Sequence, residues 1–171
     1  SDARYGTSAV WTANAVEALT NASVASMLSK TGYHQTLTVV AFSGSAGVGA
    51  STAANAATGA PTASVTTTAS GSLVYGVGND WDNGTPRTLA SEQSMVPEVA
   101  PPIGDDLWVQ KVTAPVASSG TATAVGATAP TIDRWNMVAV EIKPTTTTST
   151  PGAALNTIAD GLAASDITYD V

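Results

Sequence analysis

The alternation of large and small residues is clearest in the sequence SLVYGVG, and it predicts a buried β-strand. Leu73, Tyr75 and Val77 would lie on one face of this strand, and smaller residues on the other. The polar residues 79–84 follow directly, and they are of types that favour tight turns. We therefore expect a core strand, with Tyr75 and Val77 in the core, that ends in a tight loop around Trp81.

Several other stretches have the short, β-branched or alternating pattern of strands, and turn residues separate them. Pro97 makes one of them an edge strand, because proline cannot donate a hydrogen bond to a ladder. The stretch 36–42, TLTVVAF, is the second strongest, since it is apolar on both faces. The expected strands are 7–11, 21–28, 36–42, 63–68, 72–78, 95–99, 107–112, 121–127 and 134–142.

About nine short strands at turn-punctuated intervals predict an all-β fold, an antiparallel β-sandwich or jelly roll, over residues 1–144. Between two of these strands, residues 44–51 read GSAGVGAS, which has the glycine spacing of a phosphate-binding loop. Ala50 stands where that motif needs a lysine to neutralise phosphate. We expect a flexible glycine loop here rather than a nucleotide site.

The pattern changes after residue 144. Residues 145–152 form a threonine-rich stretch that ends in Pro-Gly, and we expect a linker there. In the C-terminal segment 153–171, Ile167, Tyr169 and Val171 alternate with polar residues, as in a half-buried strand. This segment is a candidate donor strand.

Composition excludes some partners. Thirteen acidic and six basic residues give a net charge of −7, which would repel nucleic acid. No apolar run approaches the ~20 residues that a membrane-spanning helix needs, so we expect no membrane span. The chain has no cysteine and therefore no disulfide or thiolate metal site. Because it begins at Ser1 rather than Met, we expect a processed or excised chain.

Candidate chemistry is sparse. His34 is the only histidine, so a catalytic triad with cysteine and a histidine-rich metal site are excluded by count, and we expect no enzyme activity and no cofactor. Asp80, Asp82 and Asn83 present hard oxygen atoms at close spacing, as calcium loops do, but the EF-hand pattern is missing. Two alternatives remain for them: a calcium site, or side chains that stabilise the turn through backbone N–H groups.

Trp81 is the candidate glycan-binding residue, because an exposed indole can stack on a sugar. The other tryptophans, Trp11, Trp108 and Trp135, lie in strand patterns and are expected in the core.

Three stretches carry a family resemblance: GAPTASVTTTASGSLVYGVGNDWDNGTPRTL, DDLWVQKVTAPV and TAPTIDRWNMVAVEIKP. They resemble a recurrent β-sandwich module of large secreted bacterial surface proteins, often from soil bacteria, over residues 8–144. The resemblance implies a sandwich fold and an extracellular, cell-surface location, but no activity. Members of that family usually have additional strands upstream of the position of Tyr5, and they lack a tail like residues 153–171.

We therefore expect a non-enzymatic extracellular structural subunit of a surface assembly or filament. A sandwich short of strands at its start, together with a spare strand in the tail, predicts donor-strand addition. Insertion into the next subunit would give a homo-oligomer or a pilus-like head-to-tail polymer, and insertion in the same chain a monomer. The alternative is a carbohydrate-binding or adhesive module that recognises surface glycans through Trp81.

Overall fold

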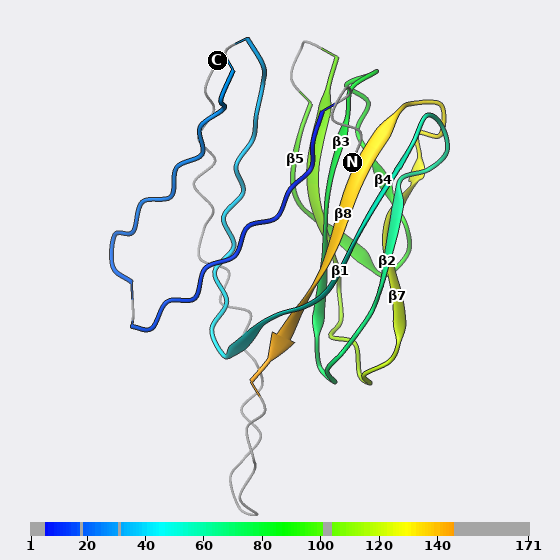
Figure 1. Ribbon diagram of the computed structural model, residues 1–171. Coiled ribbons are helices and arrows are strands. Elements are labelled where there is room, and N and C mark those ends of the chain that lie inside the picture. The colour runs from blue at the N-terminus through cyan, green and yellow to red at the C-terminus, as the bar shows by residue number, and fades with distance from the viewer. Residues whose placement is uncertain (1–5, 18, 31, 101–103, 146–171) are drawn as a thin grey trace, which may run out of the picture. The chain divides into compact units, whose positions relative to one another are not determined.

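A computed structural model of the chain describes residues 6–17, 19–30, 32–100 and 104–145 (Figure 1). These residues contain strands and no helix, and hence none that could span a membrane. The strands are β1 (Ser45–Ala56), β2 (Thr62–Thr66), β3 (Leu73–Asp80), β4 (Thr88–Leu89), β5 (Gln93–Val99), β6 (Asp106–Val112), β7 (Ala122–Ala129) and β8 (Trp135–Pro144).

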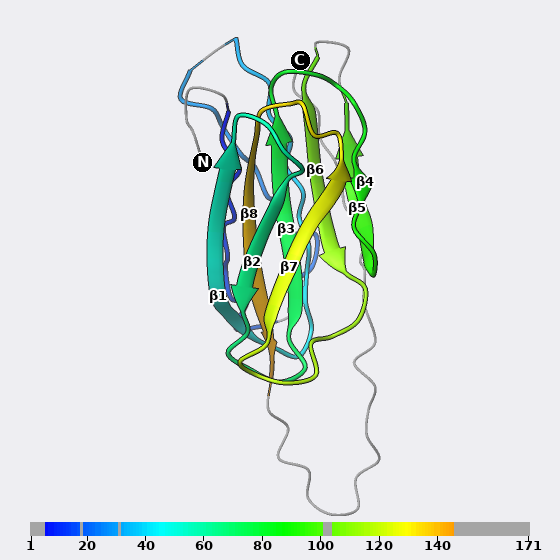
Figure 2. The ribbon, with the colours of Figure 1, turned by 90° about the vertical axis from the view of Figure 1, so that its right-hand side faces the viewer.

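The strands form two antiparallel sheets that pack face to face. One sheet has the order β1-β8-β3-β6-β5, and the other has the order β2-β7-β4 (Figure 2). Consecutive strands cross between the sheets, as in a jelly roll, except that β5 and β6 are neighbours in one sheet. The predicted all-β sandwich is confirmed.

The chain divides into two compact units. The first consists of residues 1–12 and 45–145 and contains both sheets. The second consists of residues 13–44 and 146–171, and its described part contains no strand. The predicted sandwich of residues 1–144 is thus built from residues 45–144, together with the short segment that precedes residue 13.

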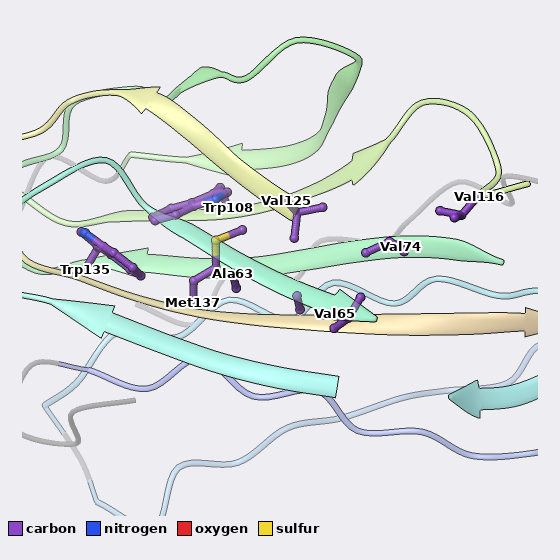
Figure 3. Close-up of a cluster of buried hydrophobic side chains, with 9 residues drawn as sticks. Ala63, Val65, Val74, Trp108, Val116, Val125, Trp135 and Met137 are labelled. Carbon is purple, nitrogen blue, oxygen red and sulfur yellow. The ribbon is translucent and has the colours of Figure 1, made fainter. Parts of the chain in front are cut away.

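The core fills the space between the two sheets. Val74, Trp108 and Met137 come from the five-stranded sheet and meet Val125 from the other (Figure 3). Each is almost completely buried, and burial of such side chains is worth roughly 1.5–3 kcal/mol apiece. The remaining buried members of the cluster are Ala63, Val65, Val116, Trp135 and Ala139.

Glycines on β3 make room for the largest of these side chains. A Cβ atom on Gly78 would lie 2.1 Å from Cζ2 of Trp108, and one on Gly76 would lie 2.5 Å from Cε of Met137. Both distances are far below van der Waals contact. The small face of β3 is therefore the core face.

The expected burial of Tyr75 is confirmed, whereas Val77 is only partly buried. Both lie on the opposite face of β3. Val109 and Val140 are also buried outside the main cluster, on that opposite face of the sheet. The five-stranded sheet is thus apolar on both faces, whereas a sandwich sheet is commonly polar on its outer face.

Six of the nine predicted strands are confirmed, as β2, β3, β5, β6, β7 and β8, and β5 is an edge strand as expected. The predictions for 7–11, 21–28 and 36–42 are wrong for the described residues, which form no strand there. A strand needs a ladder partner whatever its intrinsic propensity, and these segments have none among the described residues. Trp11 is also exposed rather than in the core, while Trp108 and Trp135 are buried as expected.

The glycine stretch 44–51 was expected to be a loop and instead forms the first half of β1. It pairs with β8 from Ser45 opposite Pro144 to Ala56 opposite Trp135, with two register shifts before Ser51. The shifts place the glycines in an irregular part of the ladder. The two-residue strand β4 was not predicted either.

The linker and tail predictions lie outside the described residues apart from Thr145, which is exposed. Ile167, Tyr169 and Val171 belong to this part of the chain, so their assignment as a donor strand stays a prediction.

Candidate functional site

The most elaborate polar arrangement lies at one end of the sandwich, in the loop that follows β3. Asp80 is the last residue of β3, and its carboxylate is buried. Its Oδ1 accepts a hydrogen bond from the Asp82 N–H at 2.7 Å and one from the Asn83 N–H at 3.4 Å. The strand therefore ends in a turn that its own last side chain stabilises, as predicted for Asp80.

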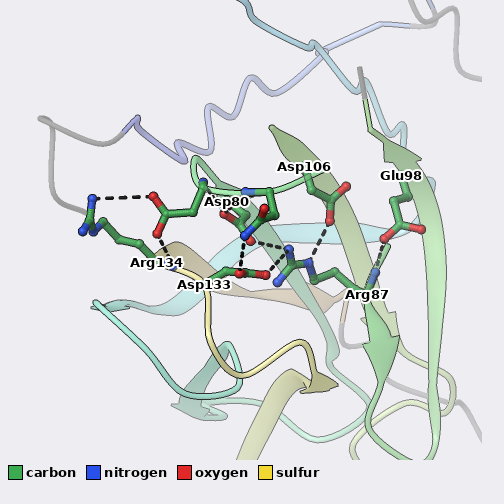
Figure 4. Close-up of polar contacts among 8 residues, drawn as sticks. Asp80, Arg87, Glu98, Asp106, Asp133 and Arg134 are labelled. Carbon is green, nitrogen blue, oxygen red and sulfur yellow. Dashed lines mark hydrogen bonds and ion pairs between the residues drawn. The ribbon is translucent and has the colours of Figure 1, made fainter. Parts of the chain in front are cut away.

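Arg87 enters this end of the sandwich from the same loop and is the hub of the cluster (Figure 4). Its Nε donates to Oδ2 of Asp106 at 2.8 Å, and its Nη2 donates to Oδ2 of Asp80. Its backbone N–H donates to Oε1 of Glu98 at 2.5 Å. A more distant ion pair, at 3.9 Å, joins Nη2 to Asp133.

One cation therefore faces three buried carboxylates, those of Asp80, Asp106 and Asp133. Burial raises the pKa of Asp106 to about 6, although its hydrogen bond to Arg87 acts in the opposite direction. Burial also raises the pKa of Asp80, and the Asp82 N–H and Arg87 offset part of that rise. The cluster thus holds more negative charge than Arg87 neutralises.

Some polar atoms of this end of the sandwich have no hydrogen-bond partner among the described residues. They are Nη1 of Arg87, Oδ1 of Asp106, Oδ2 of Asp133 and Nε1 of Trp135. Donors and acceptors are equally represented, which is the situation in which an internal water molecule can satisfy several groups.

The other polar side chains of the loop also bond to the protein. Nδ2 of Asn83 donates to Oδ1 of Asp133 at 2.7 Å. Asp82 accepts the Arg134 N–H at 3.1 Å and pairs with the Arg134 guanidinium at 3.6 Å. Asp82 and Asn83 are nevertheless exposed, and Trp81 is 44% exposed, so the loop presents its indole to solvent.

This geometry bears on the two alternatives for Asp80, Asp82 and Asn83. These three side chains bond to backbone N–H groups and to the side chains of Arg87, Arg134 and Asp133. Such contacts are typical of residues that stabilise a turn. The described residues contain no group of three acidic or histidine side chains placed to hold a metal ion. The calcium site stays a prediction for a metal-removal experiment.

A further buried carboxylate, that of Glu141 on β8, lies outside this cluster and was not predicted as a site residue. Its Oε1 accepts hydrogen bonds from the Thr68 N–H, the Ala69 N–H and Oγ of Ser72, and its Oε2 from the Ala50 N–H and Oγ1 of Thr68. Burial alone would raise its pKa, but these hydrogen bonds outweigh burial and lower the pKa to about 2. Glu141 therefore binds β1 to the turn between β2 and β3.

The remaining predicted residues do not join either cluster. His34 is exposed. Trp81 is exposed, as a glycan-binding residue would have to be. The arginine hub Arg87 was missed, because nothing in the sequence TPRTL marks it as buried.

Comparison of the chain with protein-family models, curated proteins and solved structures finds no match.

Proposed function

We propose that this chain is a non-enzymatic, extracellular structural subunit that polymerises by exchange of a β-strand. The observation that carries the proposal is the distribution of exposed apolar side chains. Among the described residues, nine large apolar side chains that are exposed lie between residues 11 and 42, and two, Trp81 and Ile132, lie elsewhere. Val16 and Met27 are 98% and 92% exposed.

Such a concentration of exposed apolar side chains is typical of an interaction surface. Two of the three segments predicted as strands in this region, 21–28 and 36–42, belong to the unit that has no strand in its described part. Segments of high strand propensity that form no strand in the described part of the chain are suited to pairing with a strand from another chain. A polymer would result if each subunit supplies a strand to the next.

The buried carboxylates also support a structural role. Asp80, Asp106 and Glu141 are enclosed and bonded to protein groups, and they hold loops and strands together. We include an extracellular location in the proposal, which the low charge content and the family resemblance support.

The tail is the proposed donor, and substitutions in the full-length chain test it. The double variant Ile167→Asp/Tyr169→Asp removes the apolar face of the predicted donor strand, while Thr168→Asp changes the polar face of the same strand. We expect the double variant to lose polymers in light scattering and electron microscopy, and Thr168→Asp to keep them. Polymers of normal length from the double variant would contradict the proposal, as would a wild-type chain that never polymerises.

A carbohydrate-binding or adhesive function is the second candidate, and the exposed indole of Trp81 favours it. A glycan array would support it if binding is reproducible and Trp81→Ala abolishes it. The matched control is Ile132→Ala, because Ile132 is another exposed apolar side chain of the sandwich unit. Equal binding by both variants, or no binding by the wild-type chain, would exclude a role for Trp81.

A further inference from the structure

The edges of the two sheets differ in how well they are protected against pairing with another strand. Strand β5 contains Pro97 and a register shift between Met95 and Glu98, and its acidic residue Glu98 bonds to the Arg87 N–H. Proline, a bulge and charge are the usual devices that block an edge. Strand β4 has only two residues.

Strand β1 is less protected, because both of its register shifts lie before Ser51. From Ser51 to Ala56 it pairs in continuous register with β8 and, among the described residues, with no other strand. The whole of β1 contains no proline and no charged residue. Its outer edge is therefore a row of backbone groups that a further strand can use.

The core is also open at this edge. Figure 2 shows β1 and β2 next to each other on one side of the sandwich, with β4 and β5 on the other. On β2 the inward residues Ala63 and Val65 are fully buried, whereas on β1 the inward residues Ala54 and Ala56 are only half-buried although they pack on the core. A strand added beyond β1 would cover them.

We propose that the free edge of β1 is the acceptor for the C-terminal strand that contains Ile167, Tyr169 and Val171. This inference rests on the proposed function, and it names the site at which the donor strand binds. The added strand would extend the five-stranded sheet to six, with its large apolar side chains over the small side chains of Ala54 and Ala56.

The residue pattern of the tail matches this edge. On β1 the exposed positions Ser51, Ala53 and Asn55 alternate with the half-buried ones, and in the tail Asp166, Thr168 and Asp170 alternate with the apolar ones. A strand paired with β1 can therefore place its polar side chains beside the exposed positions and its apolar side chains toward the core. The uncharged β1 also accepts an acidic strand without repulsion, whereas Glu98 on β5 would oppose it.

The length of the tail permits this pairing. Pro144, at the end of β8, is the ladder partner of Ser45 at the start of β1. Residues 146–166 can span at most about 75 Å when extended, and β1 is only about 40 Å long at ~3.3 Å per residue. The tail therefore leaves the sheet beside its proposed acceptor and is long enough to reach the β1 edge of its own or of a neighbouring subunit.

Disulfide trapping in the full-length chain tests the acceptor, because the protein contains no cysteine of its own. Chains with Thr168→Cys are mixed with chains that carry a cysteine at one exposed position of β1: Ser51→Cys, Ala53→Cys or Asn55→Cys. The matched control is Ser64→Cys, an exposed outward position on the neighbouring edge strand β2. We expect at least about tenfold more mixed disulfide from the best β1 position than from the control, because a bridge needs Cβ atoms about 4 Å apart.

The outcomes separate this inference from the proposed function. Polymers that depend on the tail, with equal trapping at β1 and β2 or preferential trapping at β2, would overturn the β1 acceptor while the proposed function stands. Asn55→Cys chains that link mainly to each other would also overturn it, because that result indicates pairing of two β1 edges. A chain with both Asn55→Cys and Thr168→Cys that forms only an internal disulfide at high protein concentration would support the acceptor and contradict polymerisation.

Discussion

The guanidinium carbon of Arg87 lies 4.9 Å from the centroid of the Trp108 indole ring. Arg87 thus has an aromatic face on one side and the carboxylates of Asp80 and Asp106 as ion-pair partners. A cation stacked on tryptophan and bonded to carboxylates can remain charged in a buried position. This contact connects the loop after β3 to the hydrophobic core.

Loss of the Arg87 charge should strongly destabilise the fold. In Arg87→Gln the buried carboxylates lose their cation, and we expect a loss of about 3–5 kcal/mol in the free energy of unfolding, measured by urea denaturation. The control is Arg134→Gln, since the Arg134 ion pair with Asp82 is partly exposed and should change stability by about 1 kcal/mol or less. Similar losses in the free energy of unfolding of both variants would contradict this prediction, because the buried ion pairs would then stabilise the protein no more than the partly exposed pair does.

The raised pKa of Asp106 predicts a fall in stability with rising pH. The pKa is about 6 in the folded protein and about 4 in an unfolded chain. Between these values the folded state keeps a proton that the unfolded chain has lost, so stability declines from about pH 4 to about pH 6 and then levels off. The raised pKa of Asp80 acts with the same sign. Urea denaturation of Asp106→Asn should give a flatter profile in this window, and an unchanged slope would contradict the assignment.

Glu141 predicts the opposite slope at lower pH. Its pKa is about 2 in the folded protein and about 4.3 in an unfolded chain, so its stabilising effect is present above about pH 4.3 and is lost as the pH falls toward 2. Glu141→Gln should remove this dependence and cost about 3 kcal/mol near neutral pH, since the amide nitrogen of Gln cannot accept the hydrogen bonds that one carboxylate oxygen of Glu141 accepts. Thermal melts at several pH values would measure both effects, and a variant that keeps the wild-type acid slope would contradict them.

Gly78 should not tolerate a methyl group. In Gly78→Ala the new Cβ would meet the Trp108 ring, and overpacking of this kind usually costs about 1–3 kcal/mol. In the background Trp108→Phe the atoms in conflict are absent, so the same substitution should cost less. Equal costs in the two backgrounds, in a double-mutant cycle by urea denaturation, would contradict the predicted contact.

Metal removal distinguishes the two alternatives for the loop of Asp80, Asp82 and Asn83. Because protein groups already bond to the carboxylate oxygens of Asp80 and Asp82, we expect EDTA to leave the melting temperature unchanged. A large decrease that added calcium reverses would instead establish a calcium site.

Much of the sheet could be predicted from the sequence, because β3, β6 and β8 carry β-branched and aromatic residues in a clear pattern. The pattern did not identify β1, since its alanines, glycines and serines have little strand preference and its pairing with β8 decides its conformation. At residues 36–42 a strand was predicted and none forms, for the same physical reason. Strand propensity was high there, but no ladder partner lies among the described residues.

The register of the strands decides which polar side chains meet in the two clusters, and the local sequence does not show this register. Asp80 and Asp106 are ladder partners, which follows from the pairing of β3 with β6 rather than from either strand alone. Glu141 did leave a signal. The alternation that places Trp135, Met137 and Ala139 on the core face of β8 places Glu141 on that face as well, and a charged residue at a core position indicates a buried, bonded carboxylate.

Strands β1 and β8 are neighbours in the sheet but lie far apart in the sequence, so they are synthesised at different times. The Ala50 N–H and the Glu141 carboxylate that accepts its hydrogen bond are 91 residues apart in the chain. During synthesis at about 5–20 residues per second, β1 emerges several seconds before β8 and has no strand to pair with in the five-stranded sheet. Contacts this distant in sequence are typical of slow folding. Among the described strands, β1 therefore stays without its partner in that sheet until β8 is complete.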